Sequence, residues 1–221
     1  SGCILPLLGL PFSTGEHLLI SDCEHPGIVA ACQELAKRNN LSIDILPVKQ
    51  FCNAGDLSVQ NNNLLKLLDG KLHTRTRLVV LSHVLWNTGQ LMPISEVSEL
   101  LFDHPNKPFL LVDAAQSFGQ LPIQKAALNS DIFAFTGHKW ACGPEGLGGV
   151  AISDRVLNIS SPTLIGWRSL KNEKISFQPN FDNYHQDSRR FEIATSCTPL
   201  LAGLKCSLKL LDNEGRVEER F

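Results

Sequence analysis

Short apolar runs recur along the chain, and segments with helical periodicity lie between them. Continuous or alternating apolar runs of this length predict buried and half-buried strands. The expected strands are HLLIS (17–21), SIDILPV (42–48), RLVVLSH (77–83), PFLLVD (108–113), DIFAFTG (131–137) and GGVAIS (148–153). Their regular alternation with helical patterns predicts an α/β fold, in which a mostly parallel sheet is flanked by helices.

Helices are expected where apolar residues recur every three or four positions. One covers 28–38 and has Pro26 in its first turn, where proline is favoured. A second ends at LLKLLDG (64–70), with Gly70 as its stop. Further helices are expected at 94–103, in a short segment between the strands at 108–113 and 131–137, and from about Pro199 onward.

The pattern weakens between residues 160 and 190, which are polar and aperiodic and predict a long surface loop. The last residues, GRVEERF (215–221), suggest the middle of a helix, and the chain does not begin with Met. We therefore expect a fragment of a longer protein, with parts missing at both ends.

The composition is that of an ordinary globular domain, with 43% hydrophobic and 19% charged residues among 221. A net charge of −2 gives no reason to expect nucleic acid or an anionic membrane as a partner. No apolar run is long enough to span a bilayer, and the apolar start lacks the basic residues of a signal peptide.

The cysteines are odd in number, seven, and none has CxxC spacing. This argues against a disulfide framework and against a zinc site, and it favours a reducing cytoplasm. Most of these cysteines are expected to be small buried hydrophobic residues, and no metal ligand is assigned.

Polar residues follow several of the apolar runs directly. In open α/β sheets ligands bind at the carboxyl ends of the strands, so these residues are expected to converge at one edge. They are His25, the segment from His83 to Gln90, Asp113, Gln116, Thr136, His138 and Lys139.

Lys139 lies between an apolar strand and Trp140 in FTGHKW. Partial desolvation there would lower its pKa and make the neutral amine available as a nucleophile for an aldehyde. The alternative is a lysine whose ammonium group extends to solvent.

Asp113 ends LLVD, and two interpretations remain open for it. It is either a helix N-cap or a carboxylate that keeps the pyridine nitrogen of a cofactor protonated, so that the ring can accept electrons. Gln116 lies on the same face if a helix begins there, where it can donate to a phenolic oxygen of the ring. Otherwise it is a solvated helix residue.

His25 lies in a strand-to-helix turn and can either stack on an aromatic ring or be satisfied by local backbone. Thr136 and His138 flank Gly137 just before the lysine and suit phosphate contacts. The glycine-rich GPEGLGG (143–149) matches neither GxGxxG nor a Walker A loop, and predicts a turn into the next strand.

Six segments of the chain carry a resemblance to a known family: CEHPG (23–27), LSHVLWNTGQLMPI (81–94), LLVDAAQSFGQLPI (110–123), FAFTGHKWACGPEGLGGVAI (133–152), GWRS (166–169) and RRFEIATS (189–196). Together they resemble class V aminotransferase-like enzymes that use pyridoxal 5'-phosphate (PLP). Within that group they are most similar to the cyanobacterial L-cysteine/cystine C–S lyases, which are related to the cysteine desulfurases. The resemblance covers essentially the whole chain, and DAAQS followed by TGHKW is its most specific signal.

The resemblance implies the large domain of a fold-type I PLP enzyme, with a seven-stranded type of sheet. Residues 1–221 would be that cofactor-binding domain, and 199–221 would begin the helix that connects it to an absent small domain. Residue by residue, Lys139 matches the lysine that forms the Schiff base, and Asp113 the carboxylate at the pyridine nitrogen. Gln116 matches the partner of the ring hydroxyl, and His25 the histidine stacked on the ring.

The resemblance also implies phosphate ligands. Thr136 and His138 match two of them. Thr195 matches a threonine that reaches the cofactor phosphate of a neighbouring subunit, which implies a homodimer. Ser1 and Gly2 match the end of a phosphate-binding turn whose main part would precede residue 1.

The chain departs from the desulfurase pattern at Trp86, where those enzymes have an asparagine, and this leaves Asn87 without an assigned role. The substrate-binding arginine and the catalytic cysteine loop of the family both lie outside the chain. The leading hypothesis is β-elimination from L-cysteine or L-cystine, which gives pyruvate, ammonia and sulfide or persulfide. The alternatives are a cysteine desulfurase, which gives alanine and an enzyme persulfide for iron–sulfur cluster assembly, and an inactive protein that kept the fold.

Overall fold

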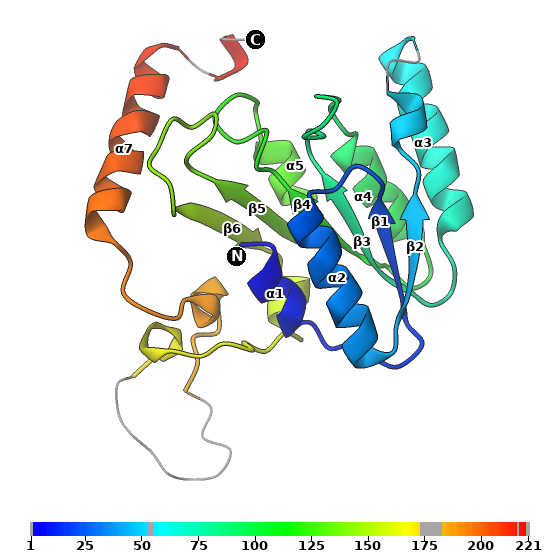
Figure 1. Ribbon diagram of the computed structural model, residues 1–221, viewed down its shortest axis with the longest axis horizontal. Helices are drawn as coiled ribbons and strands as arrows, with labels where there is room; N and C mark the ends of the chain where they lie inside the picture. Colours follow the sequence, from blue (N-terminus) through cyan, green and yellow to red (C-terminus); the bar gives the residue numbers. More distant parts are fainter. Residues whose placement is uncertain (1, 53–54, 173–182, 216, 220–221) are drawn as a thin grey trace.

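A twisted sheet forms the centre of the molecule (Figure 1), and the computed structural model describes residues 2–52, 55–172, 183–215 and 217–219. The strand order is β2-β1-β3-β4-β5-β6. All neighbouring pairs are parallel except β5 and β6, which are antiparallel. The strands are β1 (His17–Ser21), β2 (Ser42–Leu46), β3 (Thr76–Ser82), β4 (Phe109–Asp113), β5 (Ile132–Thr136) and β6 (Gly148–Ile152).

Every strand expected from the sequence is present, and the mostly parallel sheet is confirmed. The resemblance implied a seven-stranded type of sheet, whereas the described part of the chain forms a sheet of six strands. The order places β3 and β4 side by side at the centre. A crossover helix lies between each successive pair of parallel strands, as parallel pairing requires.

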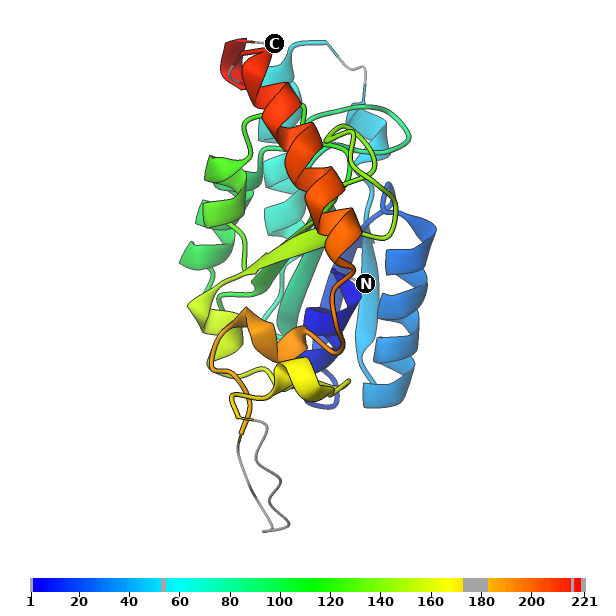
Figure 2. The ribbon, with the colours of Figure 1, turned by 90° about the vertical axis from the view of Figure 1, so that its left-hand side faces the viewer.

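Helices cover both faces of the sheet (Figures 1 and 2). On one face α3, α4 and α5 pack with residues such as Leu64, Val97 and Ala126. On the other face α1, α2 and α6 pack with residues such as Leu7 and Ile28. The α-helices are α1 (Ile4–Gly9), α2 (Pro26–Asn39), α3 (Leu57–Lys71), α4 (Ile94–Asp103), α5 (Gln124–Leu128), α6 (Asp154–Leu157) and α7 (Thr198–Asn213). Short 3₁₀ turns are η1 (Lys49–Phe51), η2 (Trp167–Ser169), η3 (Ser188–Phe191) and η4 (Val217–Glu219).

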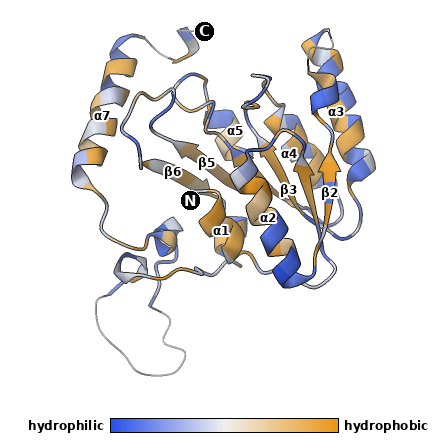
Figure 3. Ribbon diagram, in the orientation of Figure 1, coloured by the Kyte–Doolittle hydropathy of each residue, from blue (hydrophilic) through white to orange (hydrophobic). Residues whose placement is uncertain are grey.

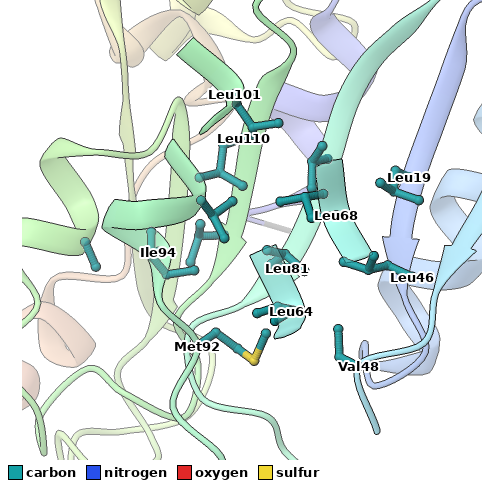
Figure 4. Close-up of a cluster of buried hydrophobic side chains, with 14 of the residues drawn as sticks. Leu19, Leu46, Val48, Leu64, Leu68, Leu81, Met92, Ile94, Leu101 and Leu110 are labelled. Atoms are coloured by element: carbon teal, nitrogen blue, oxygen red, sulfur yellow. The ribbon is translucent and has the colours of Figure 1, made fainter. Parts of the chain in front are cut away.

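Strand β3 lies at the centre of the core, because its side chains are buried on both faces of the sheet. Leu81 faces the α3 and α4 side, where Leu64, Leu68 and Ile94 surround it (Figure 4). Full burial of each such side chain contributes about 1.5–3 kcal/mol. Strands β2 and β3 are hydrophobic in Figure 3, whereas α3 presents hydrophilic positions between its apolar ones.

Two local expectations were wrong. Helix α3 continues through Gly70 to Lys71 and ends at Leu72, which is extended rather than left-handed. Helix α7 ends at Asn213, Gly215 has a φ of +105°, and the described residues 217–219 form a 3₁₀ turn, so these residues are not the middle of a helix. The short helix expected between the strands at 108–113 and 131–137 is α5, which begins at Gln124 and not directly after Asp113.

The segment 160–190 is largely irregular, as expected, although residues 173–182 lie outside the described ranges. Arg190 gives the described part an anchor that the sequence did not reveal. It is 8% exposed and donates to the carbonyl oxygens of His185, Leu157 and Ser160. These bonds tie the loop to the end of α6.

The seven cysteines are free thiols. Cys3, Cys23 and Cys32 are buried, in agreement with the sequence interpretation. Three others are exposed, which contradicts it: Cys142, Cys197 and Cys206. Among the described residues, no helix has the length and apolar character needed to cross a membrane.

Candidate active site

A cavity of about 360 Å³ opens at the carboxyl ends of β4 and β5, next to the start of α2. Its volume is within the range of small-molecule sites, about 300–1,000 Å³. Four of the residues singled out from the sequence line it: Gly2, His25, Asp113 and Thr136. They come from parts of the chain that the parallel topology brings to one edge.

Asp113 ends β4, and its side chain closes a turn instead of capping a helix. Its Oδ1 accepts a hydrogen bond from the Ala115 amide at 2.8 Å, and residues 115–120 form consecutive turns. Burial raises the pKa of this carboxyl group. The Ala115 amide opposes that shift, and so do the nearby charges of Lys139 and His25. The helix N-cap interpretation is therefore wrong, and the side chain lies in the cavity wall.

His25 is the N-cap of α2, where its Nδ1 accepts a hydrogen bond from the Gly27 amide at 3.2 Å. Pro26 follows in the first turn, as expected. Because Nδ1 accepts, the ring proton of the neutral imidazole lies on Nε2. The Trp86 ring meets the imidazole edge-on at 6.1 Å between centroids. His25 therefore both accepts a local backbone hydrogen bond and lines the cavity, so the two interpretations of this residue are compatible.

The loop after β5 carries Thr136, His138 and Lys139. The side chains of Thr136 and His138 meet at 2.6 Å between Oγ1 and Nδ1. The loop is fixed by backbone bonds from Gly143 to Gly137 and from Cys142 to Lys139. Lys139 is half-buried, as expected, and lies near enough to Asp113 to lower the pKa of its carboxyl group. The expected turn at GPEGLGG is also present, since β6 begins at Gly148.

Gln116 lies beside the cavity and contacts Trp140, which the sequence interpretation did not assign to the site. The Trp140 indole Nε1–H donates to Gln116 Oε1 at 3.0 Å. With the amide oxygen occupied, the amide nitrogen of Gln116 remains available as a donor. A phenolic oxygen that accepts a hydrogen bond requires a donor of this kind.

Thr195 does not line the cavity and is exposed between η3 and α7. Ser1 lies outside the described residues. The Asn87 side chain lies near the Cys23 thiol and lowers its pKa, in opposition to the larger rise caused by burial.

Glu24 is a buried residue of the site region that the sequence interpretation missed. It is 5% exposed and accepts hydrogen bonds from Ser21 Oγ, the Ser82 amide and Ser82 Oγ. Burial raises its pKa from 4.5 to about 7, although these bonds lower it in part. It joins the carboxyl ends of β1 and β3 directly before His25. A charged residue three positions after the end of an apolar strand was the signal that could have identified it.

Comparison with known proteins assigns the fold and the site to a family. Residues 3–220 match the family described as Aminotransferase class-V. The chain belongs to this family. A probable cysteine desulfurase of Mycolicibacterium paratuberculosis is 32% identical over 148 residues, which are 67% of this chain and 20% of that protein. The cysteine desulfurase of Escherichia coli O157:H7 is 28% identical over 201 residues, 91% of this chain and 46% of that protein.

Solved structures of the family superpose over nearly the whole chain. The cystine C–S lyase C-DES, in complex with its reaction product cysteine persulfide, has a TM-score of 0.88 and 40% identity, covering 99% of this chain and 55% of that one. A C-DES mutant has also been solved with glycine covalently linked to the PLP cofactor. A cysteine desulfurase from Thermococcus onnurineus has a TM-score of 0.77 and 27% identity, covering 97% and 50%. The chain therefore spans about half the length of the E. coli cysteine desulfurase and of C-DES.

These relatives are PLP-dependent enzymes, and the expected cofactor class is confirmed. The cavity fits PLP on chemical grounds. Asp113 lines it with a carboxylate of the kind that can pair with a pyridine nitrogen, and the Gln116 amide nitrogen, outside the lining residues, is available as a donor. Gly2 also lines the cavity, and a Cβ atom there would lie 3.3 Å from the Ala134 Cβ.

Proposed function

We propose that the full-length protein is a PLP-dependent C–S lyase that acts on L-cysteine or L-cystine by β-elimination. The observation that carries this proposal is the placement of Asp113 and His25 on one cavity, with Lys139 near enough to interact with Asp113. The 40% identity to a cystine C–S lyase supports this reaction over others of the family.

The cofactor would be attached covalently to Lys139. Asp113 would bind the pyridine nitrogen, Gln116 would donate to the phenolic oxygen, and His25 would stack on the ring. Thr136 and His138, already paired with each other, would contact the phosphate together with Gly2 and Ser1.

When bound, PLP accepts the electron pair that remains at the substrate Cα after that carbon loses its proton. The Lys139 Nζ would take this proton as a general base. Asp113 would hold a proton at the ring nitrogen. The Cβ–S bond then breaks with both electrons on sulfur, which leaves as sulfide from cysteine or as persulfide from cystine. Hydrolysis of the remaining three-carbon product gives pyruvate and ammonia.

A second candidate is a cysteine desulfurase, because the curated relatives carry that description at 25–32% identity. Such an enzyme transfers sulfur to its own cysteine and releases alanine. An inactive protein with the same fold is a third candidate. The presence of Lys139, Asp113, Gln116 and His25 together argues against it, since a protein without catalysis has no need to keep all four.

Product analysis separates these candidates. The purified full-length protein, loaded with PLP, is incubated with L-cystine, and pyruvate and alanine are both quantified. Pyruvate formed in proportion to released persulfide is the expected result. Formation of alanine and an enzyme persulfide would show a desulfurase instead of a lyase. If neither pyruvate nor alanine forms, the inactive protein is the remaining candidate.

The proposal also extends to architecture. Residues 1–221 would form the cofactor-binding domain, and 199–221 would begin the connection to a small domain. Helix α7 is consistent with this, because none of its residues is buried and Leu201 and Leu210 are 45% and 62% exposed. Thr195 would contact the cofactor phosphate of a second subunit in a homodimer located in the cytoplasm. Sedimentation of the full-length protein at the mass of a monomer would contradict the dimer.

A further inference from the structure

A cluster of two histidines and one aspartate lies at the end of the sheet opposite the cavity. His17 begins β1, Asp44 lies in β2, and His73 lies in the turn between α3 and β3. Their potential ligand atoms all lie within 4.8 Å of one another. Within the described ranges, this is the one group of three or more His, Cys, Asp or Glu side chains with such spacing.

The distances within the cluster are short. His17 Nε2 lies 3.6 Å from Asp44 Oδ2. The His17 and His73 rings lie 4.0 Å apart between centroids, tilted by 33°. In tetrahedral zinc coordination with bonds near 2.0–2.1 Å, ligand atoms are separated by about 3.3 Å. Small side-chain rotations would therefore bring the three groups to that spacing, and Asp44 is exposed enough to rotate.

His17 provides the second, independent observation. It is 1% exposed, and its Nε2 is buried without a hydrogen-bond partner in the described structure. Its Nδ1 lies 3.0 Å from Thr76 Oγ1. If Nδ1–H donates to that oxygen, Nε2 carries a lone pair and no proton. The lone pair then faces the Asp44 carboxylate, which has no proton to donate to it. A buried polar atom of this kind requires a partner.

The pattern matches a metal-binding histidine. Such a histidine commonly donates its other ring N–H to an oxygen acceptor, which fixes the ring orientation. Burial lowers the pKa of His17 to about 4, and the nearby His73 contributes to this shift.

Two positively charged side chains near the cluster reduce its attraction for a cation. Arg75 and Lys71 are close enough to lower the pKa of His17, so they weaken the local attraction for a positive ion. The Asp44 carboxylate offsets this, and its side chain is 54% exposed, which leaves a path for an ion from solvent. His73 Nδ1 accepts only a long contact of 3.4 Å from the Arg75 amide, which a metal bond would readily replace.

We propose that His17, Asp44 and His73 bind a divalent transition metal ion, with Zn²⁺ as the best match. Two imidazoles and one carboxylate are ligands that zinc prefers, and water would complete a four-coordinate site. The bound ion would join the amino end of β1 to the middle of β2 and to the turn that precedes β3. Its role would be structural and separate from the cofactor cavity. Sequence reasoning had argued against zinc from cysteine spacing, and this site contains no cysteine.

Zn²⁺ affinity tests the site directly. The full-length protein is titrated with Zn²⁺ against a competing chelator, and thermal unfolding is followed with and without the ion. One tight site per chain and a rise in Tm with Zn²⁺ are expected. Asp44→Asn and His73→Gln should each weaken binding by at least about tenfold, since even the loss of an outer partner commonly costs 10–100-fold. Asp69→Asn and His104→Gln, outside the cluster, are the matched controls.

Co²⁺ gives a second readout that does not depend on stability. Tetrahedral coordination by nitrogen and oxygen produces visible absorption, which Zn²⁺ should displace and Asp44→Asn should reduce. The proposal is overturned if the protein binds no stoichiometric ion, or if both cluster variants bind as tightly as their controls. A thiolate charge-transfer band would also overturn it, because the ion would then be held by cysteines. His17→Gln is not required, so a folding defect at the buried position does not affect the result.

Discussion

Glu24 and His17 are buried polar side chains at opposite ends of the parallel strands, and they differ in how they are satisfied. Near the carboxyl ends, Glu24 is 5% exposed and accepts from three donors of Ser21 and Ser82. At the amino ends, His17 is 1% exposed, and its Nε2 has no hydrogen-bond partner among the described residues. A side chain with internal partners can support the scaffold, whereas a buried polar atom without one calls for water, an ion or another ligand.

The largest effect is expected at Lys139. In the full-length protein, Lys139→Ala should reduce pyruvate formation from L-cystine by about 10³-fold, because the cofactor attachment and the proton acceptor at Cα are lost together. Lys125→Ala, at an exposed position on α5, is the control and should retain full activity. If Lys139→Ala still formed pyruvate at a tenth of the original rate, the proposal that catalysis occurs at the carboxyl ends of the strands would be contradicted.

Asp113→Asn should reduce activity by about 10²-fold, because a neutral amide cannot keep the ring nitrogen protonated. The same change should stabilise the cofactor-free protein at neutral pH. Burial raises the pKa of Asp113 in the folded state, so the folded chain binds that proton more tightly than the unfolded chain. Its ionisation therefore destabilises the fold as pH rises through the raised pKa. Chemical denaturation at pH 7 measures this, and a less stable variant would contradict the cause given for the shift.

Glu24→Gln tests whether the buried Glu24 carboxyl group makes the free energy of unfolding depend on pH. The folded pKa of Glu24 is about 7 against 4.5 unperturbed, so its contribution to stability is largest below pH 4.5 and is lost as pH rises to about 7. The difference in unfolding free energy between the two proteins should therefore change across this interval and be constant above it. Urea denaturation of the cofactor-free proteins at several pH values measures the difference. A difference independent of pH would show that Glu24 does not titrate in this range.

The smallest effect is expected at Trp140→Phe, which removes the hydrogen bond to Gln116 Oε1. Loss of one such bond costs about 0.5–1.5 kcal/mol, so PLP affinity should fall about 2–10-fold while the fold remains intact. Fluorescence titration with PLP measures this. Trp167→Phe, at a tryptophan that is 52% exposed, is the control. Equal affinities in the two variants would remove Trp140 from a positioning role.

The sequence predicted most of the sheet and much of the cavity for the same reason. Continuous apolar runs such as RLVVLS are typical of buried parallel strands, and parallel strands bring their carboxyl ends to one edge. Polar residues that follow these runs therefore include Asp113, His25 and Thr136, which line the cavity. The family resemblance then gave Gly2, which no periodicity identifies.

The features that sequence did not predict depend on tertiary contacts. Asp113 closes a turn rather than a helix, and within this turn Gly119 lies against the backbone of Ala141, where a Cβ would be 2.4 Å from its amide nitrogen. Gly70 remains helical, and α3 ends one residue later at Lys71. The next residue, Leu72, is extended, so the helix has no left-handed residue of the kind that a glycine stop supplies. The His17 cluster comes from three separate elements, so its members have no recognisable spacing in the sequence.

The central claim is that Lys139 binds PLP in the cavity that Asp113 lines. Borohydride reduction of the PLP-loaded full-length protein, followed by proteolysis and mass spectrometry, tests it most directly. The account predicts a pyridoxyl phosphate modification on the peptide that contains Lys139, and its absence from that peptide in Lys139→Ala. Modification at another lysine, or none at all, would contradict it.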